Sequence, residues 1–412
     1  MIKYSRMKQR AYYESFWREF DSQKPMVMIA GPRQAGKTVL AKELAAAEAS
    51  SVYFNYDIPL DKARLAAAPS FFEGVNRAKG ERPLVVLDEI HKYRGWKNYL
   101  KGIYDGYSSE YRFLITGSGR LELFHQRGDA LAGRYLRFHM LPFTLGELFS
   151  SVPRAAIPAA DLFGLPETPI SGAEEALRTM MRCSGFPEPF LKGEEKGYRR
   201  WAATYHQQIV RSDIRDAFAV RDIDAMETLY TLLVPRVGSP LSVAQLMDPL
   251  KASHKTIDSW LSVFERLLLV FRVRPYHRRI SRSILKPPKF YFYDICRVGD
   301  AGTRFENLVA VELKRATMNW TEYGLGEFGL YYLRNKEQEE VDFLVTRDEE
   351  PLCLVEAKTG EDSPAPNLRK FQTVLGVPAI QLVRQAGVSR VFHNGPNRIL
   401  VVSASAWLPN LA

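Results

Sequence analysis

The sequence predicts an α/β protein whose N-terminal part is a parallel β-sheet covered by helices on both faces. Three observations lead to this fold class. Short, continuous apolar runs have the length of buried strands, and they cover residues 26–30, 51–56, 84–87 and 112–116. Helical stretches separate these runs, and strands that alternate with helices are typical of a parallel sheet. A glycine loop directly follows the first run, and two acids follow the third.

The composition is that of a folded chain with a surplus of basic residues. Hydrophobic residues make up 46% of the 412 residues and charged residues 25%, which excludes a wholly disordered chain. The formal net charge of +10 favours an anionic partner: a nucleic acid, a nucleotide or a membrane surface. At ~100–200 residues per domain, the length indicates two to four domains.

Cysteine spacing and hydropathy exclude several other classes of protein. Cys183, Cys296 and Cys353 are far apart and have no histidine at ligand spacing, which argues against a disulfide framework and a zinc site. Residues 1–18 are polar, basic and aromatic, without the apolar core of a signal peptide. No apolar run approaches the ~20 residues of a membrane span. We therefore expect a soluble, cytoplasmic protein with no membrane partner.

The strongest motif is the glycine loop, which fits the pattern GxxxxGK[ST] without a gap. A predicted strand precedes the loop and a predicted helix follows it, as this phosphate-binding motif requires. Glycines let backbone N–H groups converge on phosphates, and the helix N-terminus adds the positive end of its dipole. We expect Lys37 to reach the β- and γ-phosphates and the Thr38 hydroxyl to coordinate Mg²⁺. The predicted nucleotide-binding residues are Gly31, Pro32, Arg33, Gln34, Ala35, Gly36, Lys37, Thr38 and Val39.

The two acids after the third strand supply the second half of the predicted site. We expect Asp88 to hold Mg²⁺ through water and Glu89 to polarise the attacking water. The sequence has no NKxD-like tetrapeptide of the kind that reads a guanine base. The motifs therefore favour ATP hydrolysis, with ATP and ADP as ligands and Mg²⁺ as cofactor.

These motifs resemble those of AAA-type ATPases, above all the bacterial and archaeal members whose C-terminal half is a domain of unknown function. The resemblance extends over nearly the whole chain. It implies an ATPase core over residues 1–150 and a helical lid over residues 151–235. It also implies that Ser118, or Thr116, at the end of the fourth strand contacts the γ-phosphate or the attacking water.

The same resemblance gives Arg134 and Pro187 their expected roles. Arg134 occupies the place of an arginine finger that reaches a neighbouring subunit's nucleotide, which implies a homo-oligomer such as a hexameric ring. A surface arginine that contacts no phosphate is the alternative. Pro187 belongs to a GxP element like that of related signal-transduction ATPases, where the proline packs near adenine; an ordinary turn is the alternative. Arg211 recurs in the lid region of the family, but we derive no role for it.

Residues 236–300 resemble a winged helix-turn-helix. A long helix is expected over residues 254–270, followed by two aromatic strands on either side of a basic loop. Residues 266–293 contain eight positive charges and no acid, a pattern that suits contacts with DNA phosphates. A winged helix used only for packing or protein contacts is the alternative. The predicted DNA-binding residues are Lys255, Arg272, Arg274, Arg278, Arg279 and Arg282.

In residues 301–412, one acid lies in a predicted helix and a second lies in a predicted hairpin. A third acid lies in the next predicted strand, with a lysine two residues after it. Residues i and i+2 of a strand share one face, so Glu356 and Lys358 project together, with Asp342 on the preceding strand. Two carboxylates can hold a hard cation and a lysine can orient water. The arrangement resembles the PD-(D/E)XK nuclease superfamily, a small α/β fold of the restriction-endonuclease type. The predicted site residues are Glu306, Asp342, Glu356, Lys358 and Gln381, with a second Mg²⁺ or Mn²⁺.

One departure from the superfamily pattern leaves the nuclease activity open. Val341 stands where the superfamily name has a proline. A nuclease-like fold without cleavage, or a salt bridge between Glu356 and Lys358 at a strand edge, fits the same residues. The sequence as a whole favours a Mg²⁺-dependent ATPase that couples ATP hydrolysis to DNA binding or processing. A regulatory ATPase with a protein partner and a non-cleaving adaptor domain is one alternative, and an ATP-gated defence or toxin-type module is another.

Overall fold

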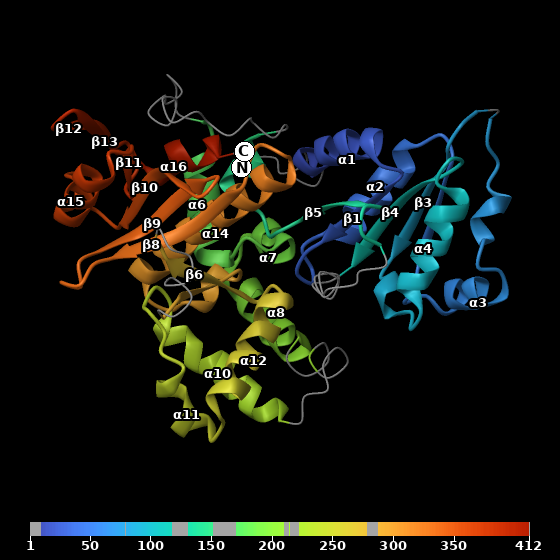
Figure 1. Ribbon diagram of the computed structural model, residues 1–412, viewed down its shortest axis with the longest axis horizontal. Helices are drawn as coiled ribbons and strands as arrows, with labels where there is room; N and C mark the ends of the chain where they lie inside the picture. The colour runs from blue at the N-terminus through green and yellow to red at the C-terminus, as the bar shows by residue number, and fades with distance from the viewer. Residues whose placement is uncertain are drawn as a thin grey trace. The chain divides into compact units, whose positions relative to one another are not determined.

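The computed structural model describes residues 10–78, 80–117, 131–150, 170–209, 214, 222–277 and 287–411 (Figure 1). The chain divides into two compact units, which meet along the sequence between Leu141 and Pro142. Each unit is described by itself. In the described residues, no helix has both the length and the apolar character needed to cross a membrane.

The first unit is built on a five-stranded parallel sheet of order β2-β3-β4-β1-β5. Its strands are β1 Met26–Ala30, β2 Ser51–Asn55, β3 Leu84–Asp88, β4 Arg112–Gly117 and β5 Leu136–His139. The parallel sheet predicted from the apolar runs is confirmed. β1 and β3 are buried along their whole length, which explains why their sequences are continuously apolar instead of alternating.

Helices cover both faces of this sheet (Figure 1). They are α1 Ala11–Gln23, α2 Lys37–Ala47, α3 Pro59–Ala67 and α4 Trp96–Tyr107, with short 3₁₀ turns η1 Phe71–Gly74 and η2 Ile90–Lys92. On one face, α1 packs Tyr13, Phe16 and Phe20 around Phe138 of β5. On the other face, Leu100 and Ile103 of α4 join the apolar core of the sheet. Each such buried side chain contributes roughly 1.5–3 kcal/mol to folding.

The second unit begins with a largely helical part. Its helices are α5 Leu145–Phe149, α6 Ala173–Cys183, α7 Pro187–Lys192, α8 Glu195–Gln208, α10 Ile223–Leu233, α11 Ala244–Leu250 and α12 His254–Arg266, with the turn η6 Val234–Arg236. Ser253 caps α12, because its hydroxyl accepts the Thr256 N–H at 3.2 Å. The expected helix over residues 254–270 is too long. It ends at Arg266, because Leu268 takes a left-handed φ of 55° and Val270 begins a strand.

An eight-stranded mixed sheet of order β12-β13-β11-β10-β9-β8-β6-β7 organises the rest of this unit. Its strands are β6 Val270–Pro275, β7 Lys289–Phe292, β8 Phe328–Arg334, β9 Glu340–Arg347, β10 Glu350–Lys358, β11 Ala379–Val383, β12 Ser389–Asn394 and β13 Asn397–Ser403. The two aromatic strands of the expected winged helix are β6 and β7. β6 pairs in parallel with β8, so one sheet runs across the boundary expected near residue 300.

Helix α14 Ala301–Glu322 is the longest helix of the described residues and packs against this sheet. The smaller elements beside it are η7 Ile295–Arg297, α15 Pro366–Leu375, α16 Ala404–Trp407 and η8 Leu408–Asn410. Glu312 of α14 accepts the Leu145 N–H at 2.6 Å, and it thereby caps α5 from the side. Burial raises the pKa of Glu312 to about 7, although Arg315 and the capped N–H groups oppose the change.

Candidate functional site

The phosphate loop connects β1 to α2 and closes around the Lys37 side chain. The Lys37 ammonium is buried and donates to the carbonyl oxygens of Gly31 at 2.9 Å and Pro32 at 2.7 Å. Gly36 has a φ of 100°, which favours glycine. A Cβ on Gly31 would lie 2.2 Å from the Met140 carbonyl oxygen, so this position has no room for a side chain. The loop therefore combines a lysine charge with the N-terminus of an 11-residue helix, as an anion site requires.

The other predicted loop residues differ in exposure. Pro32 and Ala35 are buried, whereas Arg33, Gln34 and Val39 are exposed. A residue outside the motif supports the loop. Arg10 is buried and donates to the carbonyl oxygens of Ala35 and Leu141, both at 2.8 Å. Sequence reasoning missed Arg10, because it belongs to no motif and lies 25 residues before its partner.

Asp88 lies at the end of β3 beside the loop, as predicted. Its Oδ2 accepts the Thr38 hydroxyl at 2.7 Å, and its Oδ1 accepts the Thr116 hydroxyl from β4. The carboxylate is fully buried. A hydroxyl and a carboxylate that already converge are the oxygen ligands that Mg²⁺ prefers beside a phosphate. Thr38 and Asp88 thus fit the expected Mg²⁺.

Two residues of β2 complete the surroundings of Asp88. The Tyr53 hydroxyl donates to Asp88 Oδ2 at 2.7 Å, and the Asn55 side-chain amide donates to the same oxygen at 3.2 Å. Burial, and then the Asp88 carboxylate, raises the pKa of the Tyr53 phenol, which therefore remains a donor. Sequence reasoning missed both. Their i, i+2 spacing places them on one face of a strand, but only the neighbouring position of β3 brings that face to Asp88.

Glu89 follows Asp88 with a left-handed φ of 56°, and its N–H donates to the Thr116 carbonyl at 3.0 Å. Its carboxylate pairs with Lys92 Nζ at 3.0 Å and lies 3.7 Å from His91 Nε2. Lys92 also pairs with Asp57 at 2.6 Å. Burial lowers the pKa of Lys92, but the charges of Glu89 and Asp57 outweigh that effect and raise it. The predicted water-polarising carboxylate is therefore held in an ion pair.

The remaining residues predicted for the ATPase site stay predictions. Ser118 lies outside the described residues, and its alternative Thr116 is bonded to Asp88. Arg134 pairs with Asp105 through Nε at 2.8 Å and Nη2 at 3.1 Å. Pro187 is the first residue of α7 in the second unit. Arg211 lies outside the described residues.

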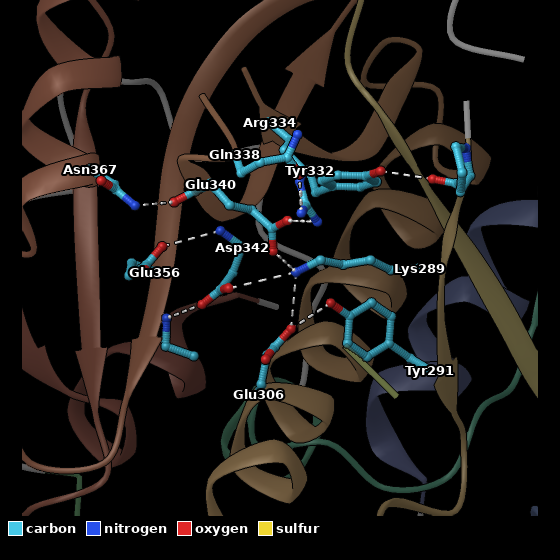
Figure 2. Close-up of polar contacts among 12 residues, drawn as sticks. Lys289, Tyr291, Glu306, Tyr332, Arg334, Gln338, Glu340, Asp342, Glu356 and Asn367 are labelled. Carbon is cyan, nitrogen blue, oxygen red and sulfur yellow. Dashed lines mark hydrogen bonds and ion pairs between the residues drawn. The ribbon is translucent and has the colours of Figure 1, made fainter. Parts of the chain in front are cut away.

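The C-terminal carboxylates lie together, as Figure 2 shows. The Asp342 N–H donates to Glu356 Oε2 at 3.1 Å, and the Ala357 N–H donates to Asp342 Oδ2 at 3.0 Å. Lys358 Nζ pairs with Glu356 Oε1 at 2.9 Å. The predicted neighbourhood of Asp342, Glu356 and Lys358 on adjacent strands is therefore present.

A buried lysine occupies the centre of this cluster (Figure 2). Lys289 Nζ lies 2.6 Å from Glu340, 3.4 Å from Glu306 and 3.8 Å from Asp342, and its side chain is 1% exposed. The Tyr291 hydroxyl donates to Glu306 at 2.7 Å. Burial lowers the pKa of Lys289, but the three carboxylates outweigh that effect and raise it, so the ammonium stays charged. The sequence showed Lys289 only as one of many basic residues, because its partners lie on α14 and β9.

Two carboxyl groups of the cluster titrate near neutral pH. Burial, and then the charge of Asp342, raises the pKa of Glu306 to about 7 in spite of Lys289. Burial and Asp342 likewise raise the pKa of Glu356 to about 7 in spite of Lys358. Burial therefore favours the uncharged form of both carboxyl groups near neutral pH.

The expected second metal ion does not fit this arrangement. Both Asp342 and Glu356 use their oxygens on lysines and backbone N–H groups within the chain. Within the described ranges, no three His, Cys, Asp or Glu side chains are placed to hold one metal ion. Gln381 is likewise engaged elsewhere. Its amide accepts the Ala365 N–H at 2.8 Å and donates to the carbonyls of Glu361 at 3.0 Å and Ser363 at 2.8 Å.

The residues predicted to bind DNA are only partly described. Arg278, Arg279 and Arg282 lie outside the described residues. Lys255 is exposed on α12, and Arg274 lies in β6. The Arg272 guanidinium pairs with Glu265 at 2.5 Å and Asp258 at 3.0 Å. The acid-free run around Arg272 suggested a free positive charge, but two acids of the preceding helix α12 neutralise it.

Three segments of the chain match family models of known proteins. Residues 23–149 match the family model described as AAA domain. This part of the chain is therefore similar to AAA domains. Residues 174–298 match a domain of unknown function, DUF8612, and residues 301–401 match another, DUF4143. The parallel sheet, the phosphate loop and the Thr38–Asp88 contact all lie within the residues that match the AAA domain model.

Similar whole proteins occur in bacteria and archaea. The uncharacterized protein Rv2008c of Mycobacterium tuberculosis is 24% identical over 93% of this chain and 80% of its own length. The uncharacterized protein MJ1637 of Methanocaldococcus jannaschii is 24% identical over 72% of this chain and 67% of its own length. A solved structure described as the structural basis for katanin self-assembly aligns with 64% of this chain and 81% of its own at 18% identity. Its TM-score is 0.23.

Proposed function

We propose that the protein is an ATPase that binds ATP with Mg²⁺ at the phosphate loop of its AAA domain. The observation that carries this proposal is the Thr38 hydroxyl 2.7 Å from Asp88, in the residue that follows the buried Lys37 of the phosphate loop. A phosphate loop needs a cation for the phosphates and oxygen ligands for the metal at one place, and these three residues supply them.

The residues have separate roles in the proposed reaction. Lys37 and the backbone N–H groups of the loop bind the β- and γ-phosphates, in place of the carbonyl oxygens that Lys37 contacts now. Mg²⁺, held by Thr38 and through water by Asp88, would neutralise charge that develops on the phosphates. Glu89 orients and polarises the attacking water once its carboxylate leaves Lys92. Thr116 and Tyr53 keep Asp88 in place.

Two variants and one control test this proposal. Lys37→Ala should lose nucleotide binding, because the charge opposite the phosphates is removed. Glu89→Gln should keep nucleotide binding but lower turnover at least about a hundredfold, the lower end of the range for a positioned acid or base group. Arg18→Ala changes an exposed residue of α1 and should leave both unchanged. Equal turnover of Glu89→Gln and the wild type would exclude Glu89 from the reaction.

A second candidate function concerns the C-terminal domain. We infer that this domain is a non-cleaving relative of nucleases, in which the Lys289 ammonium takes the place of a metal ion among the carboxylates. The position of Lys289 favours the alternative of a regulatory ATPase that binds a protein partner and has a non-cleaving adaptor domain. Incubation of the wild type with supercoiled DNA and Mn²⁺ should give no nicking above the level of Asp342→Ala. Nicking by the wild type that Asp342→Ala abolishes would establish a nuclease instead.

The coupling of ATP hydrolysis to DNA can be tested separately. The Arg272 charge is neutralised by Glu265 and Asp258, which removes one expected phosphate contact. A DNA-coupled ATPase should hydrolyse ATP faster when DNA is added, and its DNA affinity should fall steeply with salt. Turnover that is the same with and without DNA would favour the regulatory ATPase with a protein partner.

A further inference from the structure

The second unit contains a cavity of about 420 Å³ that is rich in arginine. Its walls come from α6, α8, α14 and the residue that follows β11. Arg182 and Arg178 belong to α6, Arg304 to α14, and Arg384 follows Val383 at the end of β11. Four guanidinium groups from three separate parts of the sequence thus surround one space.

Backbone carbonyls hold two of these guanidinium groups in fixed positions. Arg304 donates to the carbonyl oxygens of Val298 at 2.7 Å, Met181 at 2.9 Å and Gly299 at 3.2 Å. Arg182 donates to the Gly193 carbonyl at 3.1 Å. Carbonyl groups orient a guanidinium but carry no charge, so both arginines keep their positive charge.

Each of the two acids of the cavity wall pairs with an arginine other than Arg182, Arg304 or Arg384. Glu174 pairs with Arg178 at 3.5 Å, and Glu195 pairs with Arg199 at 2.5 Å. Arg182, Arg304 and Arg384 make no ion pair with a carboxylate in the described parts of the chain. The Arg384 side chain, which is exposed, also makes no hydrogen bond there. The cavity wall thus carries four arginines against two glutamates, and neither glutamate is paired with Arg182, Arg304 or Arg384, so positive charge is in excess.

We propose that this cavity binds a phosphate monoester of nucleotide size. Planar guanidinium groups bind phosphate oxygens through paired hydrogen bonds, and several of them favour a doubly charged phosphate over a singly charged anion. The volume lies within the range of small-ligand pockets. Leu177 and Met181 add an apolar wall on which a base or sugar can lie. The ligand is a free nucleotide or the 5′-phosphate end of a nucleic acid strand.

This site is independent of the proposed ATPase site, because its residues all lie in the second unit. Full-length protein with Lys37→Ala is therefore the background for the test, since that change removes nucleotide binding at the phosphate loop. The probes are 5′-AMP, adenosine, and a short single-stranded oligodeoxynucleotide with and without a 5′-phosphate. Binding is measured by calorimetry or by fluorescence anisotropy.

The proposal predicts that binding requires both the phosphate and the arginines. 5′-AMP or the phosphorylated oligonucleotide should bind, and the matching probe without phosphate should not. Binding of 5′-AMP identifies a free nucleotide as the ligand, whereas binding of the phosphorylated strand alone identifies a strand end. Arg384→Glu should weaken binding about tenfold or more, the loss expected for one charge-assisted contact.

Matched variants separate loss of the site from loss of the fold. Arg390→Glu reverses an exposed arginine of β12 that pairs with Asp362, outside the cavity, and should not change binding. Arg182→Gln should weaken binding as Arg384→Glu does, and both variants should keep the thermal midpoint of the parent. No binding of either phosphorylated probe, or equal binding by Arg384→Glu and Arg390→Glu, would overturn the proposal.

Discussion

The Lys289 ammonium lies 2.6 Å from the Glu340 carboxylate, with Glu306 and Asp342 on its other sides. This contact joins β7 to β9, two strands that are not neighbours in the sheet. A buried lysine among three carboxylates neutralises charge that would otherwise be costly to bury. The acids that were predicted to take part in chemistry are therefore also the partners that keep the buried Lys289 in place in the second unit.

Lys289→Met should destabilise the protein strongly. The change leaves buried carboxylates without their cation, which costs roughly 3–5 kcal/mol when one partner of a buried pair is removed. Urea unfolding followed by far-ultraviolet circular dichroism measures this loss. Lys370→Met removes an exposed lysine that pairs with Glu339 and is the matched control, with no measurable loss expected. Equal stabilities of the two variants would show that the Lys289 charge is not needed.

The same variant tests the interpretation of the lysine as a substitute for a metal ion. Without the ammonium, Glu306, Glu340 and Asp342 should accept a divalent cation. Mn²⁺ should then raise the thermal midpoint of Lys289→Met but not that of the wild type. A wild-type midpoint that rises equally with Mn²⁺ would mean that the cluster binds the metal beside the lysine.

The sequence predicted the parts of the proposed ATPase site that belong to two short motifs. The loop from Gly31 to Thr38 was recognised because strand, loop and helix are local and have fixed spacing. Asp88, 50 residues after Thr38, was recognised because it directly follows the apolar run of a buried strand. Arg10 and Tyr53 could not be identified in this way. Neither belongs to a recognisable motif, and only the packed fold brings each one to its partner.

In the C-terminal domain too, contacts within one strand could be predicted from the sequence, whereas contacts between distant segments could not. The neighbourhood of Glu356 and Lys358 follows from strand alternation, and it was predicted. The position of β6 and β7 in the eight-stranded sheet was not predicted. β7 pairs with β6, and β6 pairs with β8, a strand more than fifty residues further along the chain. The central position of Lys289 depends on that placement. A basic run without acids therefore suggested an exposed charge where the fold buries one.

Tyr53→Phe should lower ATP turnover roughly tenfold, because one hydrogen bond to the buried Asp88 carboxylate is lost. The Mg²⁺ concentration required for half-maximal turnover should rise, since Asp88 is then less firmly held. Tyr56→Phe is the matched control. Its hydroxyl makes no hydrogen bond in the described residues, and its ring stays beside Tyr93. Turnover of Tyr53→Phe equal to that of Tyr56→Phe would remove Tyr53 from the site.

The stability of the second unit should depend on pH through Glu312. Its pKa is raised to about 7 by burial, so folding favours the protonated form. The contribution of Glu312 is therefore fully present below the pKa of an unfolded glutamate and is lost as pH rises through about 7. The size of this loss is on the order of 3 kcal/mol.

Glu312→Gln should remove that part of the pH dependence. Glutamine keeps an oxygen that can accept the Leu145 N–H, but it does not titrate. Chemical unfolding at several pH values between 5 and 8 should give a flatter profile for Glu312→Gln than for the wild type. Glu350→Gln removes an exposed carboxyl of β10 and should keep the wild-type slope. Parallel profiles of Glu312→Gln and the wild type would contradict the assignment.

Arg134 gives a test of assembly. Arg134 is bonded to Asp105 in the chain, and as a finger it would leave Asp105 to reach the nucleotide of a neighbouring subunit. Specific ATPase activity should then rise with protein concentration, and Arg134→Ala should lower it without preventing ATP binding. Asp105→Asn should leave activity intact or raise it, because it frees the guanidinium. Activity that is independent of concentration would count against a finger supplied in trans.

Mixing two impaired variants makes this last prediction decisive. Arg134→Ala keeps a complete phosphate loop, and Lys37→Ala keeps a complete arginine, so a mixed interface can combine an intact loop with an intact finger. The mixture should hydrolyse ATP faster than the average of the two separate proteins. A mixture of Lys37→Ala with Asp88→Asn is the control, because both changes damage the nucleotide site of their own subunit. No interface of that mixture has a complete site, so it should show no gain. If the Arg134→Ala mixture also shows no gain, Arg134 acts within its own subunit or not at all.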